Sequence, residues 1–205
     1  MYAEDQARIQ RWCKNPEKVV QVGLVALCSI RMQWVGVGNQ LATIRAQGRT
    51  ATCLWGHKRK GYDYLVENKR LLYRTVRDLR AGRISTRAFI RQWIKVPGMG
   101  MVKAGFVAQM TCGKAGCLDM HNIIRYGLDA KMLTIPKRKN IATQMQVIDD
   151  SINHYLSVCE LCGGTEYLWD EWCRVLNEKV GTFHNADDVS RRHYIYLLNL
   201  PGDGE

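Results

Sequence analysis

The residues from Val96 to Asn122 read VPGMGMVKAGFVAQMTCGKAGCLDMHN, with turn-forming residues first and an apolar segment after them. Pro97 fixes the entry into a turn, while Gly98 and Gly100 permit positive φ and leave backbone N–H groups without side-chain cover. An apolar helix is expected to begin at Met101, so these groups lie at a helix N-terminus. Unpaired amides and the positive end of a helix dipole attract a phosphate oxygen without reading a base. The stretch therefore predicts two helices joined by a tight turn that can hold a nucleic acid backbone.

The chain on both sides of this stretch has helical periodicity, and no strand-like alternation of useful length competes with it. Pro16 at a first helical turn and Ser85 or Thr86 as a cap mark two helix starts. Val19–Cys28 is apolar nearly all round, which is typical of a buried central helix. We therefore expect an all-α fold, with helices at 3–13, 16–47, 64–79, 86–94, 101–111, 118–126, 141–162, 166–179 and 187–198.

The length and composition fit one packed unit. The chain has 205 residues, of which 46% are hydrophobic and 24% charged, close to the globular average. No run approaches the roughly 18 to 20 apolar residues that a membrane span needs. The first eleven residues have no apolar core of a secretory signal, so we expect a soluble protein inside a cell, in the cytoplasm or nucleoid, or associated with a virion.

The charge balance favours a polyanionic partner. Thirty basic and nineteen acidic residues give a net charge of +11, which attracts nucleic acid. An anionic membrane surface or a solvated face could explain the charge alone. Residues 49–61 read as a basic surface loop with Trp55, His57 and the triplet Lys58, Arg59 and Lys60. A second triplet, Lys137, Arg138 and Lys139, lies in an irregular segment, and both triplets are candidate phosphate contacts.

The turn and the residues after it resemble the helix-hairpin-helix DNA glycosylase superfamily. The hairpin of that superfamily reads hydrophobic, Pro, Gly, hydrophobic, Gly. This chain matches the pattern position for position at Val96, Pro97, Gly98, Met99 and Gly100. In the family an apolar helix with an early Ala, a short turn and an essential Asp follow. This chain is similar at each of these positions, with Ala104, a turn at 113–114, and Asp119 after Cys117 and Leu118.

The resemblance implies that Asp119 is the catalytic residue. Breaking an N-glycosidic bond builds oxocarbenium-like charge on the deoxyribose, and a carboxylate stabilises that charge or activates water. Bifunctional members carry a Lys nucleophile two residues after the second hairpin glycine, where this chain has Val102. Lys103 is one residue further on, turned by about 100° on a helix, where it could meet a phosphate. We therefore expect hydrolysis by water rather than strand cleavage through a lysine adduct.

The resemblance also sets expectations for the architecture and the cofactors. It implies two helical lobes, one of residues 18–118 and the other of 1–17 with 119–205, with a pocket at their seam near Asp119. Trp55, His57 and His121 are candidates for contacts to an extruded base. The spacing of Cys159, Cys162 and Cys173 does not complete the cluster pattern of the iron–sulfur members, so we expect no such cluster and no required cofactor. A monovalent cation at the hairpin carbonyls is compatible with the family.

Other interpretations of the same residues remain open. The turn could be only a tight connection, and Asp119 could be only the first residue of a helix. Cys159, Cys162 and Cys173 with His154 could bind zinc, although a shared apolar helix face explains them as well. Ser190 and His193 have helical spacing but no evident orienting acid.

Three functions follow from these observations. The first is a DNA-binding base-excision glycosylase that extrudes a damaged or modified base from double-stranded DNA and hydrolyses its N-glycosidic bond. The second is a non-catalytic DNA-binding protein, for example a virion-associated phage protein that keeps the scaffold. The third is a related enzyme acting on hypermodified pyrimidines in phage DNA. Sequence alone does not identify the target base or the oligomeric state.

Overall fold

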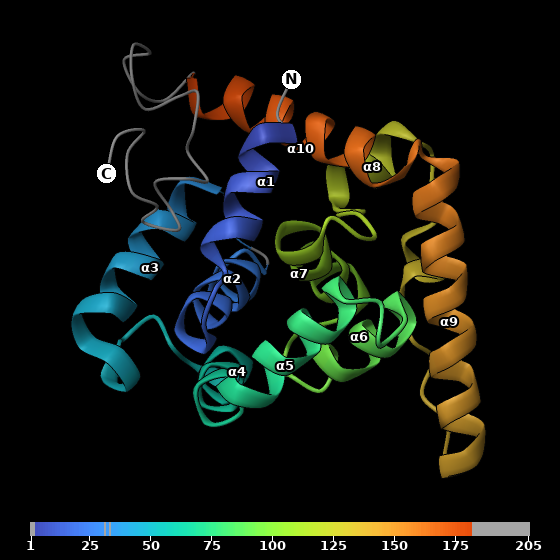
Figure 1. Cartoon of the computed structure of the whole chain (residues 1–205), viewed down its shortest axis with the longest axis horizontal. Coiled ribbons are helices and arrows are strands. Elements are labelled where there is room, and N and C mark those ends of the chain that lie inside the picture. Colours follow the sequence, from blue (N-terminus) through green and yellow to red (C-terminus); the bar gives the residue numbers. More distant parts are fainter. Residues whose placement is uncertain (1–2, 31, 33, 182–205) are drawn as a thin grey trace.

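The chain is all-helical over the residues that the computed structural model describes, which are 3–30, 32 and 34–181. Figure 1 shows the helices enclosing a shared core. They are α1 (Ala3–Trp12), α2 (Pro16–Cys28), α3 (Trp34–Gln47), α4 (Gly56–Glu67), α5 (Lys69–Arg80), α6 (Thr86–Trp93), α7 (Met101–Cys112), α8 (Met120–Arg125), α9 (Ile141–Leu161) and α10 (Gly164–Gly181), with short 3-10 helices η1 (Gly48–Thr50) and η2 (Ala130–Leu133).

Local capping explains where several helices begin. The Asn15 side chain accepts a hydrogen bond from the Lys18 amide at 3.0 Å, and Pro16 takes the first helical position of α2. Ser85 caps α6 by accepting from the Ala88 amide at 3.2 Å. These two helix starts confirm the sequence prediction.

Helix α2 lies at the centre of the fold. Every residue from Val22 to Cys28 is buried, as the apolar composition of this segment predicts. Helices α3, α4, α5 and α7 pack around it, so this one helix contacts four others. Burial on nearly all sides explains why no polar stripe interrupts the α2 sequence.

Two expected helices are each divided in the structure. The helix expected to run to residue 47 ends at Cys28, where the Ser29 hydroxyl donates to the Ala26 carbonyl at 2.8 Å. The helix expected over 64–79 is broken at Asn68, whose side-chain amide donates to the Tyr64 carbonyl at 3.0 Å. In both places a polar side chain bonds a carbonyl of the last turn and so offers the backbone an alternative to continuing the helix.

The prediction of a basic loop over 49–61 was also wrong, because α4 begins at Gly56 and contains the triplet Lys58, Arg59 and Lys60. Gly56 has φ +54, which permits the sharp entry into the helix. Lysine and arginine are good helix formers. Two of the three cations bond the protein itself, so the triplet supports the fold of this region.

Helices from the two ends of the described chain cover α6 and α7. Helix α1 packs on α7, α9 packs on α6, and α10 contacts both α9 and α1. Figure 1 shows α9 along one edge of the molecule with α10 crossing near α1. None of the helices in the described part of the chain is long and apolar enough to span a membrane. The helix expected at 187–198, with Ser190 and His193, lies outside the described residues.

Arg80 joins the C-terminal ends of two helices. Its Nη2 donates to the Gln10 carbonyl at 2.7 Å and to the Thr111 carbonyl at 2.6 Å, while Nε donates to Thr111 at 2.9 Å. Its Nη1 donates to the Cys13 carbonyl at 3.4 Å. The guanidinium therefore satisfies carbonyls at the negative ends of α1 and α7, where a cation is favoured.

Replacing Arg80 with Ala is expected to lower the free energy of unfolding by about 2–3 kcal/mol, because the bonds it loses are charge-assisted. Urea denaturation followed by circular dichroism measures this change. Arg77→Ala is the matched control, since Arg77 is exposed on the same helix three residues earlier. Equal losses in the two variants would contradict the role assigned to Arg80.

Candidate functional site

The turn between α6 and α7 exposes its two glycines and buries its apolar residues. Val96 and Met99 are buried, and the Met99 amide donates to the Val96 carbonyl at 2.9 Å, which closes the turn. Gly98 has φ +86, so this position needs glycine. Gly100 is extended, with φ −87, so the positive φ considered for it does not occur.

The N-terminus of α7 has no side-chain cap, because its N-cap residue is Gly100. The first amide to find a partner within the helix is that of Ala104, which donates to the Gly100 carbonyl at 3.0 Å. Met101, Val102 and Lys103 supply no acidic side chain to the first turn. The amides before Ala104 are therefore suited to an outside acceptor such as a phosphate oxygen.

Helix α4 supports the turn from one side. A Cβ atom on Gly61 would lie 2.6 Å from the Pro97 carbonyl oxygen, so the turn approaches α4 as closely as a glycine allows. A Cβ atom on Gly98 would lie 3.3 Å from Cβ of His57. The start of α4, including exposed His57, thus lies directly against the hairpin.

The segment after α7 brings the chain back along that helix to Asp119. Gly113 ends α7 in the left-handed conformation with φ +62, and residues 115–118 are all buried. A Cβ atom on Gly116 would lie 2.3 Å from Cδ1 of Leu168 on α10. The Tyr155 hydroxyl of α9 donates to the Gly116 carbonyl, and the same hydroxyl lies against Gly105 of α7. The segment is therefore packed between α7, α9 and α10.

Buried amide side chains fix the backbone just before Asp119. Gln109, fully buried on α7, accepts from the Cys117 amide at 3.0 Å and donates to the Thr165 carbonyl of α10 at 3.0 Å. Asn122 donates from Nδ2 to the Cys117 carbonyl at 2.6 Å. Both polar groups of Cys117 are thus bonded, and the position of Asp119 follows from bonds to three helices.

Asp119 is half-buried and caps α8. Its Oδ1 accepts from the His121 amide at 3.0 Å and from the Asn122 amide at 3.2 Å. Among the hydrogen bonds of the described residues, its Oδ2 takes part in none. The structural role considered for Asp119 is therefore present, and it leaves one carboxylate oxygen available to a water or a sugar.

Lys103 and Asp119 both lie close enough to the Cys117 thiol to change its pKa. Burial raises the pKa of this thiol well above its usual range, and the negative charge of Asp119 raises it further while Lys103 lowers it. Lys103 Nζ also lies 5.9 Å from the centroid of the Phe106 ring. Lys103, on the first turn of α7, thus lies on the side of that helix along which the chain returns to Asp119.

The first basic triplet is divided between structural and exposed roles. Lys58 Nζ donates to the Cys28 carbonyl at 3.1 Å and to Gln40 Oε1 at 3.0 Å, and partial burial lowers its pKa. Arg59 donates to the carbonyls of Leu54 and Ala51 at 3.1 and 3.2 Å. Lys60 is exposed. Of the three predicted phosphate contacts, Lys60 is the one whose side chain faces solvent.

The remaining candidates lie at different places. Trp55 is 74% exposed and is the N-cap residue of α4. His121 is exposed on the first turn of α8 next to Asp119. Residues 137–139 are exposed just before α9, whose start is roughly 21 Å along the helix axis from Tyr155. His121 therefore shares the Asp119 region, whereas Trp55 and His57 lie at the start of α4, where His57 is against the hairpin.

The eight cysteines are free thiols, six of them buried. Burial raises the pKa of Cys13, Cys28 and Cys159 to about 12, which keeps these thiols protonated and unreactive at neutral pH. Cys159 Sγ approaches the Gly116 carbonyl at 3.9 Å. Within the described ranges no group of three or more Cys, His, Asp or Glu side chains is placed to hold a metal ion.

Sequence reasoning did not select Gln109, Tyr155 or Asn122 as parts of this site. Gln109 carried a signal, because it is a polar residue in an otherwise apolar stretch of α7 and a buried amide must find partners. Tyr155 carried none, since its partner lies 39 positions away.

Comparison with family models, curated proteins and solved structures finds no match to this chain. The likeness to helix-hairpin-helix glycosylases therefore depends on the residues from Val96 to Asn122 themselves.

Proposed function

We propose that this protein binds double-stranded DNA through the hairpin at 96–100 and hydrolyses the N-glycosidic bond of a damaged or modified base at Asp119. The observation that carries the proposal is the pairing of two features at the starts of two consecutive helices, α7 and α8. Uncapped amides lie at the N-terminus of α7, and a half-buried carboxylate with an unused oxygen follows the buried segment that returns along it. The two-lobed division at residue 118 and an intracellular or virion-associated setting belong to the same proposal.

The reaction requires a carboxylate at the sugar. Water forms a bond to C1′ of the deoxyribose as the C1′–N bond breaks, and the electron pair of that bond leaves with the base. The ionised Asp119 stabilises the developing positive charge or accepts the proton of the attacking water. Val102, at the position of the family's nucleophilic lysine, cannot form a Schiff base, which supports water as the nucleophile.

The DNA backbone would lie along the hairpin and the start of α4. The hairpin amides take a phosphate, and exposed Lys60 adds positive charge nearby. Trp55 supplies an aromatic face on which an unpaired base can stack. A monovalent cation would be held by hairpin carbonyls and would supply positive charge for binding a phosphate. The carbonyls of Val96 and Gly100 already accept the amides of Met99 and Ala104.

A panel of duplexes tests the proposal. Each duplex carries one uracil, one oxidised purine or one hypermodified thymine, and heating in alkali after incubation reveals abasic sites. The proposal expects alkali-labile product from at least one duplex, and no strand break before the alkali treatment. Salt-sensitive binding without product on any duplex would instead support a non-catalytic DNA-binding protein.

Gly98→Ala is expected to weaken duplex binding about tenfold. An Ala is strained in the left-handed backbone conformation of residue 98, and the backbone movement that relieves this strain would displace the hairpin amides. Fluorescence anisotropy at fixed salt measures the Kd. The matched control is Gly127→Ala, which also places an Ala at positive φ, +61, with no described residue within 4 Å of its Cβ. Equal Kd values for the two variants would place the DNA somewhere other than the hairpin.

A further inference from the structure

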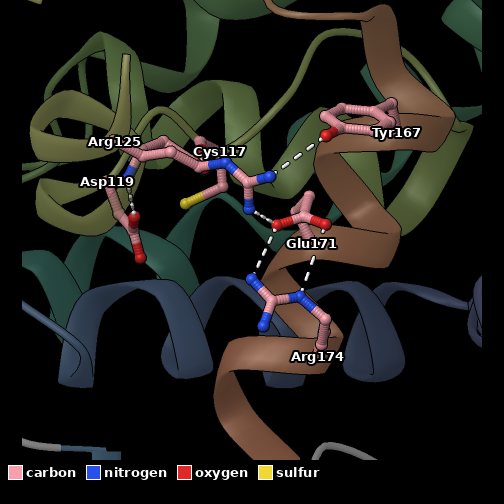
Figure 2. A network of polar contacts seen from close by, with 7 residues as sticks. Cys117, Asp119, Arg125, Tyr167, Glu171 and Arg174 are labelled. Atoms are coloured by element: carbon pink, nitrogen blue, oxygen red, sulfur yellow. Dashed lines mark hydrogen bonds and ion pairs between the residues drawn. The ribbon is translucent and has the colours of Figure 1, made fainter. Parts of the chain in front are cut away.

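A cluster of charged side chains joins α8 to α10 at the end of α8 opposite Asp119 (Figure 2). Arg125, the last residue of α8, donates from Nη2 to the Tyr167 hydroxyl at 3.2 Å and forms an ion pair through Nη1 with Glu171 Oε2. Arg174 Nη2 lies 3.0 Å from the same Oε2. One carboxylate therefore lies between two guanidinium groups and connects two helices.

Glu171 is the least exposed charged side chain of this cluster. Its side chain is 14% exposed, whereas those of Arg125 and Arg174 are 40% and 46% exposed. Partial burial reduces the solvent screening that makes surface ion pairs weak, and the Arg125 guanidinium also has a second partner in Tyr167. The pair between Arg125 and Glu171 is thus better ordered than an isolated surface pair.

Helix α8 depends on few attachments. It has six residues, shorter than an isolated helix can be in water, and Asn122 is its one buried residue. Met120 and Ile124 are 60% and 71% exposed, so Ile123 is the apolar side chain of α8 that packs, partly buried, against the core. Asn122 ties the helix to Cys117 near its start, and Arg125 ties it to α10 at its end. Without the second tie, α8 would keep the contacts of Asn122 and Ile123 but lose its attachment to α10 through Arg125.

We propose that Glu171 is a positioning residue, which holds α8 through Arg125 and thereby fixes the Asp119 carboxylate at the first turn of that helix. This inference rests on the proposed function for its effect on catalysis, but its structural part stands apart from activity. Glu171 itself is not placed to touch the sugar, since it acts through Arg125 at the far end of α8.

The test compares Glu171→Gln with Glu166→Gln. Both variants remove one negative charge from α10, so both change the long-range attraction for DNA alike, but Glu166 is exposed on the first turn. We expect Glu171→Gln to lower the single-turnover excision rate about tenfold, with a Kd for the duplex within about twofold of that of Glu166→Gln. A rate equal to that of the control would overturn the inference.

A second measurement does not need activity. The amides of His121 and Asn122 are the two that Asp119 caps, so their hydrogen exchange, followed by NMR, reports on the placement of its carboxylate. Exchange at both should quicken at least threefold in Glu171→Gln and in Arg125→Met, and remain unchanged in Glu166→Gln. The double variant should be no faster than either single one, because both remove the same ion pair. Unchanged exchange would overturn the positioning role, whereas faster exchange in a protein that excises no base would retain that role and reject the proposed function.

Discussion

Asp119→Asn is expected to lower the rate of base excision about 10³-fold, or about 4 kcal/mol, while duplex binding changes little. The substitution removes the negative charge that the oxocarbenium-like transition state needs. Asparagine keeps an oxygen that can accept from the amides of His121 and Asn122, so the cap on α8 survives. Single-turnover kinetics on the duplex identified by the panel measures the rate.

A second substitution separates the two roles of Asp119. Asp119→Ala loses the charge and the cap, so it should match Asp119→Asn in rate and lose about 1 kcal/mol of stability as well. Urea denaturation of the two variants gives the difference. An Asp119→Asn variant that excises within threefold of the wild type would reduce Asp119 to a helix cap.

Gly105→Ala is expected to lower the free energy of unfolding by about 3–4 kcal/mol, which combines overpacking with the loss of a buried hydrogen bond. The added Cβ would lie 2.0 Å from the Tyr155 hydroxyl, too close for the ring to remain in place. Because that hydroxyl donates to the Gly116 carbonyl, the segment leading to Asp119 would lose its tie to α9.

The control for this prediction is Gly36→Ala on α3. Among the described residues, an added Cβ there meets the terminal methyl of Met32, at 2.7 Å, which is the end of a flexible side chain. Alanine is also the better helix former, so this variant should equal or exceed the wild type in stability. A Gly105→Ala midpoint as high as that of Gly36→Ala would contradict the prediction. It would show that the Tyr155 ring moves away from the added Cβ at little cost.

The predicted elements that the structure confirms are those with local signals. Asn15, Pro16 and Ser85 act within three residues of themselves, and Gly113 ends α7 as a left-handed residue. The divisions at Ser29 and Asn68 have no proline or glycine to mark them. They arise from side chains that bond carbonyls of the preceding turn, an alternative that competes closely with helix continuation.

The basic triplet shows why composition misleads about location. Three consecutive cations favour a solvated loop by charge alone, yet Lys58 reaches the Cys28 carbonyl 30 positions earlier. A lysine stem can lie along apolar surface while its ammonium finds an acceptor. This contact depends on how α2 and α4 pack, which no local pattern contains.

The candidate site also combines residues that the sequence predicts with residues that it does not. The hairpin and Asp119 are close in sequence and follow a spacing that can be read directly. The side chains that hold them, Gln109, Tyr155 and Glu171, act across 8, 39 and 46 positions. Such long-range partners are fixed by tertiary packing, so they became visible only in the structure.

The proposed function requires that a single duplex contacts both the hairpin and Asp119. An NMR titration of Asp119→Asn with a short duplex containing a tetrahydrofuran abasic analogue tests it most directly. We expect the amides of residues 98 and 100–103 and those of His121 and Asn122 to shift together, with a single Kd that rises with salt. Shifts confined to other surfaces, with the hairpin amides unmoved at saturating DNA, would contradict it.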